Sequence, residues 1–272
     1  MNQPGQSSAT IGDLIPEVKS WLQNRSDVTE DPSQQPNPAM RPSAWIRDSL
    51  REITASQQFE ELRTTGPLKN IGPGLGYNGS NYQYLISYFL DSGADYTMME
   101  DPVIFLTPTQ AMSVGLVGTS VSSSNSTVGY PMDYVTPKAI QSILFISGGI
   151  PFKYTRYGNQ FWFGTQPGTN YQVNVPYQIR HPFIDTELVA SPVYVPADWL
   201  DIIAIAAAER GATKLRWNEQ SSFLHQMLWG DPATQMKDGV LGMPGLVTAR
   251  KLQMSRDKRL STVQFMPIVS RY

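Results

Sequence analysis

The sequence contains no cysteine and only two histidines, His181 and His225. Without cysteine the chain cannot form disulfide bonds or thiolate metal sites, which fits synthesis in a reducing compartment. Two histidines leave little material for a histidine-based metal or catalytic cluster, and no sequence feature links the two. We therefore expect both to be hydrogen-bonded structural side chains.

Charged residues are also scarce: they make up 16% of the chain, where an average globular protein has about a quarter. The formal net charge of −2 gives no strong global field that would attract nucleic acid. The longest apolar run, Ile202–Ala208, is far short of the roughly 20 residues that span a membrane. The first residues lack the basic and apolar regions of a signal peptide. We expect no membrane contact and no signal peptide.

Glycine, proline and aromatic residues are plentiful instead, with 21 glycines, 21 prolines and 11% aromatics. This balance favours a subunit with many loops and protein contacts over a freely diffusing monomer. Motifs of nucleophilic catalysis are missing, and the glycine-rich stretch at residues 72–76 lacks the Lys-Ser/Thr pair of a phosphate-binding loop. The sequence thus predicts no enzymatic activity, no cofactor and no metal.

Two amphipathic helices are predicted in the first quarter of the chain. Apolar residues recur at helical spacing from Ile11 to Leu22. Because proline in a helix interior costs roughly 3 kcal/mol, we place Pro16 in the first turn, with Asp13 as N-cap and the helix over residues 14–24. A proline-rich linker, Ser26–Pro42, precedes a second helix over residues 44–63 that Ser43 caps.

Strand patterns dominate from Tyr82 to Pro192, where we expect five to seven short strands. Residues 171–179 alternate apolar and polar side chains, which is typical of a half-buried antiparallel strand. Tyr157-Gly158-Asn159 has the composition of a hairpin turn. The serine-rich segment Ser113–Gly129 is expected to form an exposed loop or hairpin that proteases cut first.

The stretch Tyr194–Trp229 has the longest helical pattern and predicts one long amphipathic helix that starts near Pro196 or Asp198. Two charges, Arg210 and Lys214, fall within its apolar arc. A buried unpaired charge costs several kcal/mol, so each must find a partner or reach solvent. We expect Arg210 to pair with a carboxylate of the second helix, in the same or the next subunit. The candidates are Asp48, Glu52, Glu60 and Glu61.

A further helix is predicted at Val247–Arg256, near a basic cluster. The cluster consists of Arg250, Lys251, Arg256, Lys258 and Arg259. The final segment, Thr262–Tyr272, is apolar enough to require a docking site. We expect it to be extended and to bind a partner or a neighbouring subunit. The candidate partner-binding residues are Arg256, Arg259, Phe265, Ile268, Val269 and Tyr272.

Together these patterns predict an α+β fold: a helical bundle with an inserted antiparallel β subdomain and an extended C-terminal tail. Residues 1–66 would supply the N-terminal helices of the bundle. Residues 67–192 would form the β subdomain, and residues 193–272 the long helix and the docking tail.

The order of these pieces resembles the head-to-tail adaptor (neck, or connector) proteins of tailed bacteriophages. The resemblance covers Ile11–Leu62 and Tyr130–Trp229. It is carried by WIRDSLREITASQQFEELR, then PMDYVTPKAIQSILFISG and PGTNYQVNVPYQIRHP, and finally VPADWLDIIAIAAAERGATKL. It consists of element order and of diffuse aromatic and turn positions, without a catalytic signature.

The resemblance implies a structural protein of the virion neck, assembled in the cytoplasm of the host bacterium. Twelve copies would form a ring around the DNA channel, bind the portal protein on one side and tail, nozzle or tail-terminator proteins on the other. Viral DNA would pass without sequence-specific contacts. It also implies no cofactor and no enzymatic activity, and it gives the C-terminal segment the role of docking on the portal.

Two alternatives remain open at this stage. The chain could be another neck or tail ring component, such as a tail terminator or tube protein, although a tube protein is mostly strand. It could instead be a binding module whose β subdomain recognises a carbohydrate or a receptor. The aromatic residues that support this second alternative are Tyr82, Tyr84, Tyr88, Phe161 and Trp162.

Overall fold

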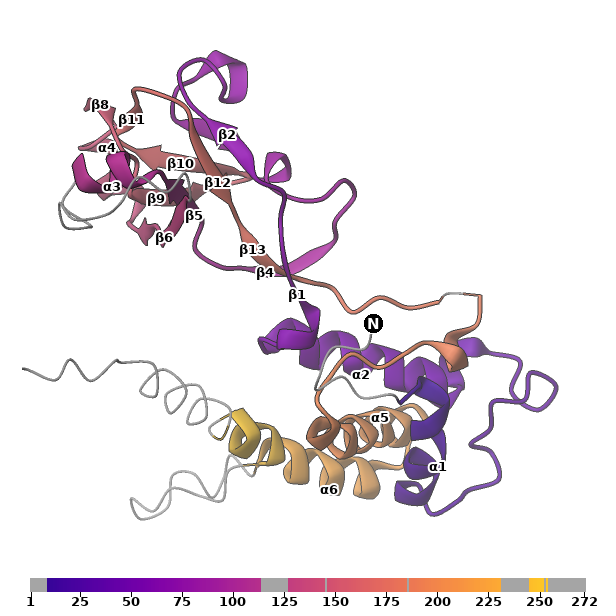
Figure 1. The fold of residues 1–272 in the computed structure, drawn as a ribbon. Helices are drawn as coiled ribbons and strands as arrows, with labels where there is room; N and C mark the ends of the chain where they lie inside the picture. The colour runs from indigo at the N-terminus through magenta and orange to yellow at the C-terminus, as the bar shows by residue number, and fades with distance from the viewer. Residues whose placement is uncertain are drawn as a thin grey trace, which may run out of the picture. The chain divides into compact units, whose positions relative to one another are not determined.

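The computed structural model describes residues 9–113, 127–144, 146–184, 186–230, 245–251 and 253. It has an α+β fold and divides into two compact units (Figure 1). The helical unit comprises residues 1–62 and 181–272, and the β unit comprises residues 63–180. The β unit is therefore inserted between two halves of the helical unit. The β unit spans residues 63–180 in the structure, whereas the sequence predicts residues 67–192.

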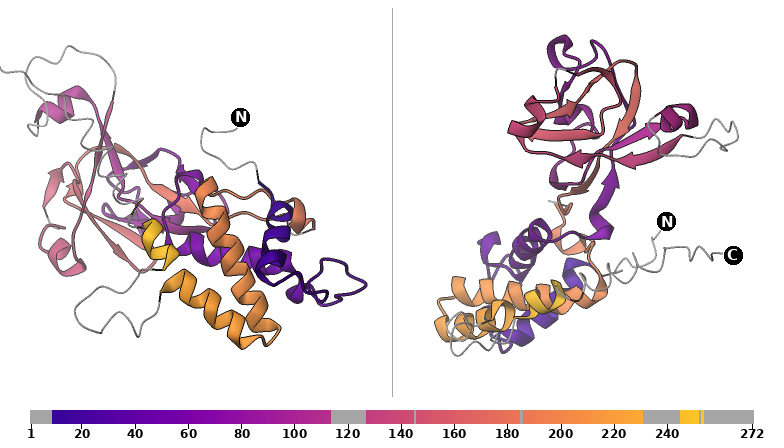
Figure 2. Two further views of the ribbon diagram at one scale, coloured as in Figure 1. Left: turned by 90° about the horizontal axis from the view of Figure 1, so that it is seen from below. Right: turned by 90° about the vertical axis from the view of Figure 1, so that its left-hand side faces the viewer.

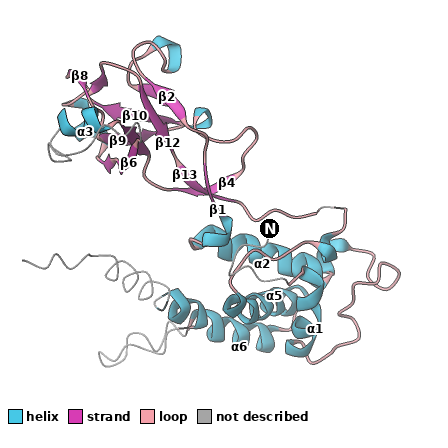
Figure 3. Ribbon diagram, viewed as in Figure 1, coloured by secondary structure: helices cyan, strands magenta, loops and turns pink. Residues whose placement is uncertain are grey.

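In the helical unit, α5 packs against α1, α2 and α6. The described strands, magenta in Figure 3, all lie in the β unit, together with a few short helices. The α-helices are α1 (Ile11–Trp21), α2 (Pro42–Ser56), α5 (Leu200–Lys214) and α6 (Asn218–Trp229). The 3-10 helices are η1 (Pro38–Met40), η2 (Glu60–Leu62), η5 (Leu188–Ala190) and η6 (Ala197–Trp199). Residues 246–251 are also helical.

Helix α1 begins three residues earlier than the sequence predicts and contains Pro16 in its interior. Thr10 and Asp13 form a capping box: the Thr10 backbone N–H donates to Asp13 Oδ2 at 2.7 Å, and Asp13 is thus the third helical residue. These hydrogen bonds lower the pKa of Asp13. The predicted Asp13 N-cap is wrong because the capping box and the burial of Ile11 favour the earlier start despite the proline.

Helix α2 is shorter than predicted, since it ends at Ser56 and the chain resumes helical geometry only in η2. Its N-cap position is Arg41 and not Ser43. The carboxylate of Glu30 accepts hydrogen bonds from the backbone N–H and the hydroxyl of Ser43 at 2.5 and 2.8 Å. A side chain from the proline-rich linker therefore satisfies the start of the helix, which local sequence rules cannot anticipate.

The single long helix predicted over residues 194–229 is wrong, because the chain reverses between α5 and α6. Arg216 adopts the left-handed conformation with φ 57°. The N–H of Trp217 donates to the carbonyl of Ala212 at 2.8 Å, and that of Arg216 to Thr213 at 3.1 Å. These two bonds form a Schellman motif, in which arginine holds the position that glycine usually occupies.

The amphipathic character expected for this region is also wrong, because α5 is buried on nearly all sides. Residues 202–208 are seven consecutive buried positions, and Gly211 and Ala212 are buried as well. A helix that is apolar all round lies in a core. Its alanine and glycine content allows α1, α2 and α6 to approach closely, as the two views of Figure 2 illustrate.

The β unit contains more and shorter strands than expected, with thirteen in its described part. The first six are β1 (Arg63–Thr65), β2 (Lys69–Ile71), β3 (Gln83–Leu85), β4 (Tyr96–Met99), β5 (Val103–Leu106) and β6 (Val128–Pro131). They are followed by β7 (Asp133–Tyr134), β8 (Ser147–Gly149), β9 (Lys153–Tyr157), β10 (Gln160–Gly164), β11 (Gln166–Pro167), β12 (Tyr171–Asn174) and β13 (Pro176–Ile179). Helices α3 (Pro108–Ser113) and α4 (Pro137–Gln141) and the 3-10 helices η3 (Tyr77–Gly79) and η4 (Ile86–Tyr88) complete it.

These strands form four small sheets with the orders β1-β13-β4, β3-β10-β9-β7, β11-β8 and β2-β12-β5-β6. Pairing is antiparallel except between β11 and β8 and between β7 and β9. The predicted hairpin at Gly158-Asn159 joins β9 to β10 and is confirmed. Residues 171–177 keep the predicted alternation, but Gln178 is buried and the register shifts between Gln178 and Ile179. The segment forms two strands in different sheets, because Val175 leaves the ladder and its carbonyl accepts from Gly66 N–H.

The core of the β unit is rich in aromatic rings. Tyr84, Phe89, Phe161 and Phe163 contact one another with ring centroids 5.6–6.0 Å apart. All four side chains are buried. Two of the aromatic residues that supported a binding module, Tyr84 and Phe161, are therefore core residues.

Two predicted features lie outside the described residues. Of the serine-rich segment 113–129, the structure describes only residue 113 and residues 127–129. The segment Thr262–Tyr272 is not described at all, so its extended conformation and its docking role stay predictions.

Candidate functional site

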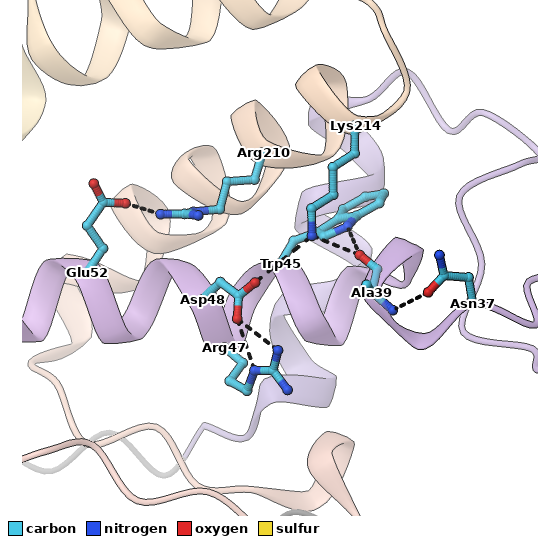
Figure 4. A network of polar contacts seen from close by, with 8 residues as sticks. All are labelled: Asn37, Ala39, Trp45, Arg47, Asp48, Glu52, Arg210 and Lys214. Carbon is cyan, nitrogen blue, oxygen red and sulfur yellow. Dashed lines mark hydrogen bonds and ion pairs between the residues drawn. The ribbon is translucent and has the colours of Figure 1, made fainter.

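The two charges that the sequence analysis selected, Arg210 and Lys214, lie side by side on α5 and reach toward α2 (Figure 4). Arg210 forms an ion pair with Glu52. Lys214 donates to the backbone carbonyl of Ala39 at 2.8 Å, and its Nζ lies 4.0 Å from Asp48 Oδ2. The expected pairing of Arg210 with a second-helix carboxylate is thus confirmed within one chain. Any role in contacts between subunits stays a prediction.

The spacing of these residues explains why both pairs form. Asp48 and Glu52 are four residues apart on α2, and Arg210 and Lys214 are four residues apart on α5. Residues at this spacing share one face of a helix. Two pairs of oppositely charged side chains therefore connect α2 and α5. Both cations keep about a third of their side-chain surface exposed. The charges escape the cost of burial by pairing and by reaching solvent.

The 3-10 helix η1, next to Lys214, is held in place through the carbonyl oxygen of Ala39, which accepts two hydrogen bonds. The indole N–H of Trp45 donates to the Ala39 carbonyl at 3.0 Å, so this oxygen accepts from both Trp45 and Lys214. Asn37 caps η1 by accepting from the Ala39 N–H at 3.0 Å. Trp45 is fully buried. The linker before α2 is therefore fixed to α5 through polar contacts as well as through packing.

A second set of polar contacts connects α5 to α6. Glu209 and His225 lie 2.7 Å apart, and the hydroxyls of Thr213 and Ser221 are also 2.7 Å apart. Glu209 and Arg210 are consecutive residues of α5, so a helical wheel points their side chains about 100° apart. In the structure both side chains reach the same hollow, because α2 and α6 flank α5 on neighbouring faces. His225 is hydrogen-bonded, as expected.

The polar contacts between α2 and α5 and those between α5 and α6 border a cavity of about 330 Å³. The cavity is lined by Glu52, Ile53, Ala206, Glu209, Arg210, Thr213, Lys214, His225 and Trp229. Its two carboxylates balance its two permanent cations, so it has no strong preference for an ion of either sign. Its charged groups and Thr213 already have partners, either in the lining or beside it. This arrangement is suited to holding helices in register and offers no unpaired nucleophile.

A larger hollow of about 770 Å³ lies elsewhere on the helical unit. It is lined by Glu30, Asn37, Pro38, Ala39, Arg41, Ser43, Ala44, Arg47, Thr186, Glu187, Leu188 and Val189. Three of its charged side chains have partners: Glu30 binds Ser43, the Arg41 guanidinium donates to the Gln35 carbonyl at 3.0 Å, and Arg47 pairs with Asp48.

His181, the other histidine, is a structural side chain of the helical unit. Its Nε2 accepts a hydrogen bond from the Tyr194 N–H at 3.0 Å, and its ring contacts those of Phe183 and Tyr194. Burial and the nearby charge of Arg51 lower the pKa of His181 to about 4. The imidazole is therefore neutral at physiological pH and carries its proton on Nδ1.

The described residues contain no group of three or more histidine or acidic side chains that could hold a metal ion. No described helix combines the length and the apolar character needed to cross a bilayer. The predicted partner-binding residues Arg256, Arg259, Phe265, Ile268, Val269 and Tyr272 lie outside the described part of the chain. Of the basic cluster, Arg250 and Lys251 are described: Arg250 lies 3.4 Å from Asp198 and donates to Gln253 at 2.8 Å.

Comparison with known proteins gives no further assignment: no family model matches the chain, and no curated protein is significantly similar to it.

Proposed function

We propose that this protein is a head-to-tail adaptor of a tailed bacteriophage, a ring subunit that joins the portal to the tail around the DNA channel. The observation that carries the proposal is the order of the elements. Residues before and after the β unit build one helical unit, and the sequence resemblance to adaptor proteins rests on the same order. The proposal makes the protein structural, without enzymatic activity or a cofactor.

The surface of the helical unit supports a role in assembly. Large apolar side chains are exposed on several of its elements: Ile184, Val189, Phe223 and Leu246. Phe223 is 53% exposed although it lies within α6. Such side chains are available for contacts with neighbouring copies. The paired charges of α2 and α5 stiffen the framework that would present them.

Native mass spectrometry and negative-stain electron microscopy of the full chain, alone and mixed with its portal, test the proposal. We expect a ring of twelve copies, or a monomer that forms such rings only on the portal. A stable monomer that neither forms rings nor binds a portal would contradict the adaptor function. A ring of different symmetry that binds only tail proteins would favour another neck or tail component.

A truncated chain tests the predicted docking segment. Deleting Thr262–Tyr272 is expected to preserve the circular dichroism spectrum but to prevent attachment to heads. A matched control replaces the same residues with a Gly/Ser linker of equal length, which keeps the chain length and removes the apolar side chains. Normal attachment of both variants would reject the docking role.

A further inference from the structure

Three aromatic side chains form a row on the β unit, which we call the aromatic strip: Tyr82, Trp162 and Tyr157. Tyr82 directly precedes β3, Trp162 is on β10 and Tyr157 ends β9. These strands are neighbours in the sheet β3-β10-β9-β7, of which Figure 1 labels β9 and β10. The Trp162 ring lies 6.1 Å from that of Tyr82 and 4.9 Å from that of Tyr157.

Trp162 and Tyr157 of the aromatic strip lie on the face of the sheet opposite the core. Along β10, Phe161 and Phe163 are buried in the core, whereas Gln160 and Trp162 are only partly buried. Side chains alternate between the two faces of a strand, so Trp162 points away from Phe161. Tyr157 is 56% exposed. Core packing therefore accounts for Tyr84 and Phe161 but not for the exposed ring of Tyr157.

The strands around the strip contribute neutral side chains to this face. Register places Gln83 and Thr155 beside Trp162, and Leu85 and Tyr157 beside Gln160. The indole N–H of Trp162 donates to Gln160 Oε1 at 3.0 Å, which leaves the amide NH₂ of Gln160 as a donor. Lys153 comes next on this face of β9, beyond Thr155 and opposite Gly164.

We propose that the aromatic strip binds a neutral oligosaccharide. The C–H faces of pyranose rings pack on aromatic side chains, and amide groups such as those of Gln83 and Gln160 hydrogen-bond sugar hydroxyls. A nucleic acid strand would also stack on aromatic rings but requires a positively charged groove along its backbone. The described strands place no cation among the three rings, so a neutral ligand fits better. This site is independent of the proposed adaptor function.

The test uses the full chain and immobilised neutral oligosaccharides of hexoses and N-acetylhexosamines. Isothermal titration with the strongest binder follows. Tyr157→Ala and Trp162→Phe are expected to weaken binding, Tyr157→Ala by about tenfold or more because it removes the most exposed ring. Tyr134→Ala is the matched control: Tyr134 is 54% exposed on β7 of the same sheet, but its ring contacts Tyr154 and not the strip. Its affinity should equal that of the wild type.

Three results would overturn the proposal. The first is the absence of binding to every neutral oligosaccharide by a chain whose circular dichroism shows it to be folded. The second is an equal loss of binding in Tyr157→Ala and Tyr134→Ala. The third is that Tyr157→Ala changes the oligomeric state, or abolishes binding of an oligo-dT strand, without affecting glycan binding. A subunit that binds glycans but forms no ring would reject the adaptor function alone.

Discussion

Arg210 on α5 and Glu52 on α2 form an ion pair between residues 158 positions apart in the chain. One helical turn later on α5 and one turn earlier on α2, Lys214 approaches Asp48. The pair joins the two halves of the helical unit, which the inserted β unit separates in sequence. Long-range contacts of this kind fix how α2 and α5 are aligned.

Replacing Arg210 with methionine is expected to lower the free energy of unfolding only modestly. Glu52 is 53% exposed and Arg210 33%, so the coupling between them should be about 0.5–1 kcal/mol, as for other solvent-exposed pairs. Urea unfolding of Arg210→Met, Glu52→Gln and the double variant measures this coupling. Effects that simply add would show that the pair contributes nothing. Arg180→Met provides a comparison, because Arg180 and Asp95 form a still more exposed pair.

His181 is expected to make the stability of the helical unit depend on pH. The fold lowers the pKa of His181 from 6.5 to about 4, so between these values the unfolded chain binds a proton that the folded chain does not. The free energy of unfolding is therefore unaffected by His181 above pH 6.5. As the pH falls from 6.5 toward 4, it decreases by roughly 3 kcal/mol in total. Urea unfolding at a series of pH values should show that the free energy of unfolding falls less steeply with decreasing pH in His181→Gln than in the wild type.

His225→Gln is the control for this experiment, because His225 is an exposed residue of α6. The free energy of unfolding of His225→Gln should fall with decreasing pH as steeply as that of the wild type. Burial raises the pKa of Glu61, so that residue contributes stability below its ordinary pKa and loses it as the pH rises. Comparing each variant with the wild type removes this opposite trend. Equal slopes for His181→Gln and the wild type would contradict the role of His181.

Arg216→Gly is expected to stabilise the protein. Arg216 has φ 57°, a conformation that costs a non-glycine residue about 1 kcal/mol, and its side chain is exposed. Glycine would relieve this cost, although it gains entropy in the unfolded chain. Thermal unfolding should show a higher midpoint for Arg216→Gly than for Arg216→Ala. The reverse order would indicate that the arginine side chain itself holds the turn between α5 and α6.

Gly211→Ala is expected to destabilise the protein, although alanine favours helices by about 1 kcal/mol. A Cβ at this position would lie within 2.5 Å of Cε3 of the Trp45 ring and 3.0 Å from Leu22 Cδ1. Such overpacking costs about 1–3 kcal/mol. Denaturant unfolding measures the loss, and Trp45→Phe in the same chain should recover part of it. Ser222→Ala, on the exposed surface of α6, should have little effect.

Pairing of Arg210 with a carboxylate of the second helix could be predicted from helix geometry and charge, but the choice of Glu52 among the four candidates could not. A helical wheel puts Arg210 on a packed face, and the cost of an unpaired buried charge requires a carboxylate there. The position of Glu209 could not be predicted in the same way. A wheel over residues 194–229 puts Glu209 on a polar arc with Asp198 and Asp201, but the reversal of the chain brings α6 and His225 to that side. A wheel describes one helix and contains no information about a second helix that folds back on it.

The sequence alone determined that helical segments flank a strand-rich segment, since hydrophobic periodicity is a local property of the chain. It also determined the hairpin at Gly158-Asn159, because glycine readily supplies the positive φ of that turn. Tertiary structure decided where elements begin and end. The reversal at Arg216 requires a left-handed arginine, which has no sequence signature, and the start of α2 depends on Glu30 from the preceding linker. In these places a local conformational preference is smaller than the free energy gained by burying α5 among three neighbouring helices.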